Sequence, residues 1–109
     1  MNLKSVGEII ASRRLTLLTE GTCSSEIVVL MGKPEEFPEG ADYYCPYQIK
    51  GYGREKVMVV GGIDPFQAIQ LALSSIGVEL AAIRKESGGE LVWDAGEKGD
   101  LGFGSAERG

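Results

Sequence analysis

The stretch that decides the fold runs from residue 64 to residue 85 and reads DPFQAIQLALSSIGVELAAIRK. It carries the start signals of a helix, because Asp64 suits the N-cap, Pro65 the first helical position and Gln67 a capping box. Two basic residues followed by two glycines mark its end. We therefore expect one helix of roughly 30 Å, long enough to cross a small sheet from edge to edge.

One face of this helix is apolar at a spacing of about 100° per residue and is expected to pack on a sheet. Its predicted members are Phe66, Ile69, Leu73, Ile76, Leu80 and Ile83, with Ala72 beside them. Gly77 lies within the same arc, where a glycine costs about 1 kcal/mol relative to alanine. We expect it to allow close approach of the helix backbone to a strand, with a local kink as the alternative.

A second apolar stripe, formed by Leu71, Val78 and Ala82, lies on the opposite side of the predicted helix. Leu101 and Phe103 could cover this stripe from within the chain, which is the favoured interpretation. The alternative is an interface with another copy, because an uncovered apolar patch often marks an interaction surface.

The segments around the helix alternate in the manner of strands, and short connections favour antiparallel pairing. We predict an α+β fold in the order β-β-β-β-α-β, a four- to five-stranded antiparallel meander with one long helix packed on one face. The predicted strands cover residues 8–18, 26–31, 42–50, 54–60 and 90–94, and residues 32–40 are predicted to form a loop without regular structure.

Three details of these strands are specific enough to be checked. Strands 26–31 and 54–60 have apolar residues on both faces and are expected to be buried on both. Pro46 cannot donate to a ladder, so its strand is expected at an edge or with a bulge. Arg13 is expected near the sheet rim, interrupting an inward-facing set formed by Ile9, Ala11, Leu15 and Leu17.

With 109 residues, the chain has room for a single domain, predicted over residues 1–104, and residues 105–109 are predicted to be a disordered tail. Its net charge of -5 disfavours nucleic-acid binding. The start MNLKSVGEII does not resemble a signal peptide, and no uninterrupted run of about 18 apolar residues is present. We therefore expect a cytoplasmic protein that does not bind a membrane.

We predict no catalytic, cofactor-binding or metal-binding residues. Histidine is absent, which excludes Ser-His-Asp and Cys-His arrangements within one chain. Cys45 is read as a small buried hydrophobe. The glycine turn into Asp64 has no Walker lysine, and the carboxylates at 94, 97 and 100 lack EF-hand spacing. Both are interpreted as ordinary surface features.

Two further groups of polar and aromatic residues are candidate contact sites. Four tyrosines cluster around the predicted hairpin at residues 42–60; packing is the default role, and a recognition surface formed by Tyr44 and Tyr52 is secondary. A pocket between helix and sheet would draw its polar contacts from Gln67, Gln70 and Tyr47.

Four short segments, CPYQIKG, GIDPFQAIQLALSSIG, GELVW and GDLGF, resemble a family of small bacterial domains of unknown function. The resemblance covers the second half of the chain well and the first half loosely. It implies a bacterial, soluble, single-domain protein and carries no established activity.

The sequence favours a non-enzymatic protein–protein interaction module, either a self-associating protein that forms a homodimer or an accessory or immunity-type protein that masks a partner. The alternative is a small-ligand-binding protein or minor enzyme with a pocket between helix and sheet.

Overall fold

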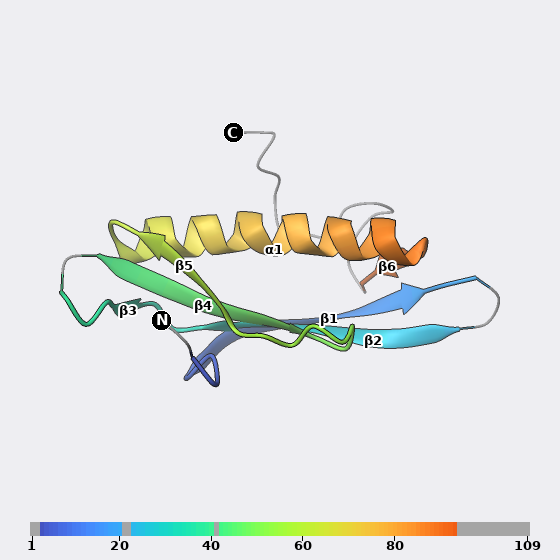
Figure 1. Ribbon diagram of the computed structural model, residues 1–109, viewed down its shortest axis with the longest axis horizontal. Helices are drawn as coiled ribbons and strands as arrows, with labels where there is room; N and C mark the ends of the chain where they lie inside the picture. The colour runs from blue at the N-terminus through green and yellow to red at the C-terminus, as the bar shows by residue number, and fades with distance from the viewer. Residues whose placement is uncertain (1–2, 21–22, 41, 94–109) are drawn as a thin grey trace.

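The computed structural model describes residues 3–20, 23–40 and 42–93 as an α+β fold, with one long helix lying on one face of an antiparallel sheet (Figure 1). The predicted fold class is confirmed. The elements are β1 Ile9–Leu18, β2 Ser24–Gly32, β3 Glu35–Glu36, β4 Tyr43–Lys50, β5 Met58–Gly62, α1 Pro65–Ser87 and β6 Glu90–Val92.

The sheet is a meander to which β6 is added at one side. β2 lies between β1 and β4, β5 pairs with the other side of β4, and β6 pairs with the end of β1. The two-residue β3 pairs with β4 at Tyr43 and Tyr44, on the same side as β2. The prediction that residues 32–40 hold no regular element is therefore wrong. Its prolines and glutamates disfavour a strand locally, but the returning chain passes alongside β4.

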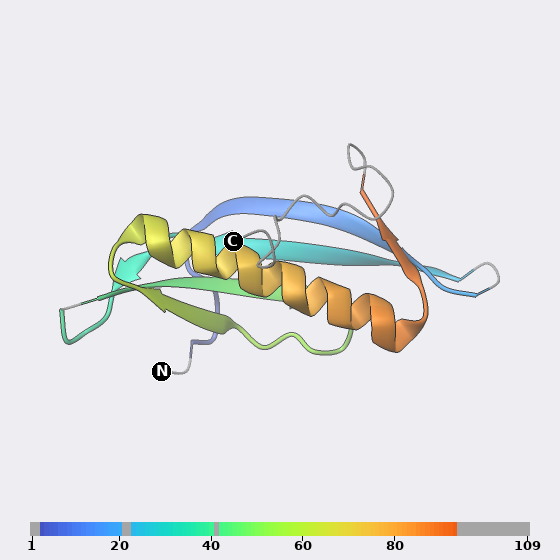
Figure 2. The ribbon, with the colours of Figure 1, turned by 90° about the horizontal axis from the view of Figure 1, so that it is seen from above.

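α1 crosses the sheet obliquely from the end of β5 to the β6 side (Figure 2). It begins at the predicted N-cap and ends at Ser87, two residues beyond the predicted end. Asp64 accepts a hydrogen bond from the Gln67 backbone N–H at 2.7 Å, and Gly88 adopts a left-handed φ of 69° while its N–H donates to the Arg84 carbonyl. The Gln67 side chain accepts from the Ile63 N–H at 2.8 Å, one residue before the position that a standard capping box uses.

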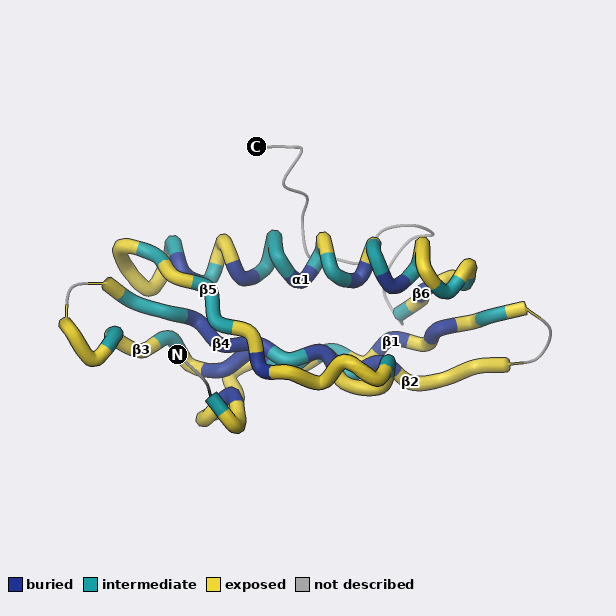
Figure 3. Tube along the Cα trace, viewed as in Figure 1, coloured by how far each residue is buried: buried dark blue, intermediate teal, exposed yellow. Residues whose placement is uncertain are grey.

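The core lies between α1 and the inner face of the sheet, and the outer side of the helix alternates between exposed and half-buried residues (Figure 3). The sheet contributes Leu15, Leu17, Ile27, Val29, Met31, Cys45, Tyr47, Ile49 and Leu91, and the helix contributes Ala68, Ala72, Ile76, Leu80 and Ile83.

The buried face of α1 is rotated from the predicted one. Phe66 is 80% exposed, and Ile69 and Leu73 are half-buried, so the predicted packing of Phe66 is wrong. The helix instead turns the small residue Ala68 toward the sheet, where a Cβ on Gly62 would lie 2.5 Å from the Ala68 nitrogen. This is the close approach that sequence analysis assigned to Gly77, which is only half-buried.

Several strand predictions also need correction. Ile9 and Ala11 are exposed, and a register shift between them changes the side that Ile9 faces relative to the rest of β1. Val28 and Leu30 are half-buried, so β2 is buried on one face only, although its central position is as predicted.

The predictions for β4 and β5 differ from the structure in a linked way. β5 is an edge strand with Met58 exposed, not a strand buried on both faces. β4 is internal, not an edge. β4 accommodates Pro46 because neither β2 nor β3 pairs with that residue. Its one ladder partner is Val59 of β5.

Candidate functional site

The candidate site is a groove between α1 and β5, named here the α1–β5 groove. Its volume is about 580 Å³. The helix supplies one wall and the edge strand the other, and its lining residues are Tyr47, Met58, Val60, Leu71, Ser74, Ser75, Val78 and Glu79. Leu71 and Val78 are two of the three residues of the predicted second apolar stripe, for which an interface was the alternative to cover from within the chain.

The exposed apolar side chains of this groove come from both walls. Val78 is 61% exposed, Leu71 44% and Met58 38%. The third predicted residue, Ala82, is half-buried. Sequence analysis missed Met58 and Val60, because it placed them in a strand buried on both faces. Their two-residue spacing puts them on one side of β5, facing the helix.

A polar contact forms the floor of the groove. The Tyr47 hydroxyl donates a hydrogen bond to the Glu79 carboxylate on α1, although the tyrosine ring is buried. Burial raises the pKa of Tyr47 above its usual range, and the bond to Glu79 and the charge of that carboxylate raise it further. Tyr47 therefore stays protonated and joins the helix to β4.

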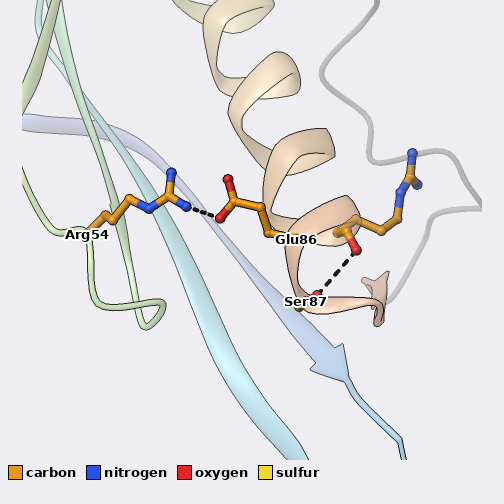
Figure 4. Close-up of polar contacts among 4 residues, drawn as sticks. Arg54, Glu86 and Ser87 are labelled. Atoms are coloured by element: carbon orange, nitrogen blue, oxygen red, sulfur yellow. Dashed lines mark hydrogen bonds and ion pairs between the residues drawn. The ribbon is translucent and has the colours of Figure 1, made fainter.

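An ion pair joins the loop before β5 to the C-terminal end of α1. The Arg54 guanidinium bonds the Glu86 carboxylate, as Figure 4 shows. In the same region the Ser87 hydroxyl donates to the Arg84 carbonyl at 3.3 Å. Both ion-pair side chains are about half exposed, so the pair orients the loop more than it stabilises the fold.

The residues of the predicted ligand pocket are not brought together. Gln67 bonds the backbone at the helix N-terminus, Gln70 is exposed, and Tyr47 lies at the helix–sheet seam. Among the residues of the α1–β5 groove, only Tyr47 belongs to that predicted set.

The predicted tyrosine surface is also divided. Tyr44 contacts the Phe37 ring at a centroid distance of 5.2 Å, and its side chain lies on the face of β4 opposite to that of Cys45 and Tyr47. Tyr52 lies beyond the other end of β4, where it packs against the core beneath Arg54. Six strand positions, roughly 20 Å, separate Tyr44 from Lys50 at the end of β4, and Tyr52 lies in the bend beyond it.

A second, smaller cavity lies between β1 and α1, with a volume of about 150 Å³ and lining residues that include Arg13, Met31 and Leu73. It is smaller than the 300 Å³ or so at which ligand pockets begin. Arg13 lies on this inner side with its guanidinium 3.7 Å from the centroid of the Trp93 ring, on the part of β1 that β6 leaves uncovered, which agrees with its predicted place near the sheet rim. This cation–π contact explains how a half-buried arginine is accommodated.

The buried thiol of Cys45 has the environment of a packing residue. Burial raises its pKa to about 11, so the thiol is protonated at neutral pH. The sulfur lies 3.7 Å from the Gly32 carbonyl oxygen, to which it donates. This arrangement favours the structural role that sequence analysis gave it.

α1 is long and apolar enough, by length and composition, to cross a membrane. Sequence analysis missed this property because it considered only uninterrupted apolar runs. A helix that packs on a core passes the same test, and α1 buries five residues against the sheet.

Several expectations lie outside the described residues. They are the carboxylate loop at 94–100, the cover supplied by Leu101 and Phe103, the last residue of the predicted strand 90–94, and the tail at 105–109. Within the described residues, no group of three or more cysteine, aspartate or glutamate side chains is arranged to hold a metal ion.

A family model described as Domain of unknown function (DUF6968) matches residues 11–105. The match spans every described element except the start of β1. Comparisons with curated proteins and with solved structures give no match.

Proposed function

We propose that this chain, which belongs to the DUF6968 family of domains of unknown function, is a protein–protein interaction module that binds a partner through the α1–β5 groove. The observation that carries the proposal is the exposure of Leu71, Val78 and Met58 around one groove. Burying apolar area of this kind stabilises a complex by about 25 cal/mol per Å² before the costs of association.

The position of the groove at a sheet edge to which no other described strand pairs further supports this role. A partner can add a strand to β5 while its side chains enter the groove, so main-chain bonds and apolar contacts form together. The alternative of a small-ligand or enzymatic pocket has less support, because Gln67 and Gln70 do not reach the groove. A bacterial, cytoplasmic setting without membrane or nucleic-acid contact remains a prediction.

Photo-crosslinking in cells that naturally make the chain tests the proposal. Val78→p-benzoylphenylalanine places the probe in the groove, and Thr16→p-benzoylphenylalanine places it at an exposed position of β1. We expect adducts of defined mass from position 78 that are absent from position 16. Adding Leu71→Glu should abolish them by placing a charge in the groove. Equal labelling from both positions, or none from position 78, contradicts the proposal.

A further inference from the structure

We propose that the groove is occupied by a second copy of this chain, through antiparallel pairing of β5 with the β5 strand of the other copy about a two-fold axis at Val60. This inference rests on the proposed function and identifies the partner of the same site. A two-fold interface uses one surface twice, so the surface must complement itself.

The first requirement is a free strand edge. β5 pairs only with β4 among the described residues, so one side of its backbone is unpaired. The strand carries no charged side chain between Met58 and Gly62. Charged residues and prolines are the usual features that prevent pairing at an edge, and none interrupts this segment.

Pro46 identifies which backbone groups face outward. It is opposite Val59 in the β4–β5 ladder and has no N–H, so this pair is of the non-hydrogen-bonded type. Pair types alternate along an antiparallel ladder, so Val60 and Met58 bond β4, while Val59 and Gly61 direct their N–H and C=O groups to the open edge.

These outward groups determine the register. A two-fold axis at Val60 places Val59 opposite Gly61 of the partner copy, twice. Each of these pairs forms two hydrogen bonds, which satisfies all four outward backbone groups of every strand. The two Val60 residues then face each other as a non-hydrogen-bonded pair, in which side chains approach most closely.

The side chains are self-complementary in the same register. Val60 and Met58 point to the groove side, where Leu71 and Val78 of each helix face the axis. No charged side chain lies within the paired segment in this register, because Lys56 and Asp64 both lie outside Met58–Gly62.

The part of the β1 edge that β6 leaves uncovered is less suited to self-pairing. β6 covers β1 only from Thr16 to Leu18, and the exposed Ile9 and Ile10 lie at the far end. The middle of that uncovered edge contains Arg13 and Arg14. A two-fold axis there would place the arginines of the two copies near each other, and like charges in opposite strands are destabilising.

Disulfide trapping in the full chain tests the register. In a Cys23→Ser/Cys45→Ala background, which also removes the thiol opposite Val60 in the β4–β5 ladder, Val60→Cys is expected to oxidise to a covalent dimer, because non-hydrogen-bonded pairs have Cα atoms about 4.5 Å apart, within disulfide range. The matched control is Met58→Cys. The two cysteines at position 58, one from each copy, would lie four strand positions apart, roughly 13 Å, which is beyond disulfide reach. We expect about tenfold more covalent dimer from Val60→Cys than from Met58→Cys.

Two measurements on the unsubstituted chain keep the test independent of the folding of these variants. Light scattering from about 10 μM to about 1 mM should show a mass rising toward twice 11.7 kDa. Amide hydrogen exchange at Val59 and Gly61 should slow over the same range. A monomer at every concentration, or dominant trapping at Met58, overturns the inference.

The two proposals fail in different ways. A strictly monomeric chain whose Val78 probe labels a different protein, in a manner sensitive to Leu71→Glu, overturns the two-fold dimer and leaves the interaction module standing. A monomeric chain without any such adduct overturns both.

Discussion

Replacing Leu80 and Phe66 by alanine, one at a time, tests which side of α1 packs on the sheet. Sequence periodicity places both residues on one buried face. The structure buries Leu80 completely and leaves Phe66 80% exposed. The two substitutions should therefore have very different effects on the free energy of unfolding.

The magnitudes follow from burial. Leu80→Ala removes three buried carbon atoms at about 0.8 kcal/mol each, and the residual cavity brings the expected loss to about 3 kcal/mol. Only a fifth of the Phe66 side chain is shielded, and full burial of phenylalanine contributes about 1.5–3 kcal/mol, so Phe66→Ala should cost roughly 0.3–0.6 kcal/mol.

Urea unfolding followed by circular dichroism, at a concentration where the chain is monomeric, measures both values. In thermal unfolding of the same variants, the expected fall in Tm is about 12 °C for Leu80→Ala and about 2 °C for Phe66→Ala. A loss for Phe66→Ala that equals or exceeds that for Leu80→Ala would show that the helix is rotated toward the face predicted from sequence, and would refute the packing described here.

Three further predictions test individual contacts. Gly62→Ala should cost about 1–3 kcal/mol of unfolding free energy, because its Cβ would lie 2.5 Å from the Ala68 nitrogen. Gly61→Ala should be nearly neutral, because its Cβ would first meet the Phe37 ring at an ordinary contact distance of 3.6 Å. Thermal unfolding compares the two variants. Asp64→Ala should cost about 1 kcal/mol by removing the 2.7 Å cap bond, and Asp64→Asn should restore most of it, as measured by urea unfolding. Because the pKa of Tyr47 is raised, the native state holds this proton more tightly than the unfolded state, so stability is full below about pH 10 and falls as the pH rises above it. Tyr47→Phe should make that alkaline loss smaller in unfolding curves at a series of pH values, and an unchanged slope would contradict the assignment.

The helical apolar residues of the candidate site could be predicted from the sequence. Leu71 and Val78 stand out because seven residues bring a helix back to nearly the same side, at a place where charges are expected. Met58 and Val60 could not be found in this way. A short apolar strand has the same residue pattern at the edge of a sheet as at its centre. Only the pairing of the strands decides which position it takes.

The local sequence by itself determined where α1 begins and ends and the α+β class, because caps, glycines and apolar periodicity act through contacts between near neighbours. Tertiary structure decided the rotation of α1, the internal place of β4 and the open edge of β5. These depend on which strand lies beside which and on how closely Gly62 lets Ala68 approach the sheet. Such contacts join segments that are distant in the sequence or belong to different elements. They therefore cannot be predicted from the residue pattern of any single segment.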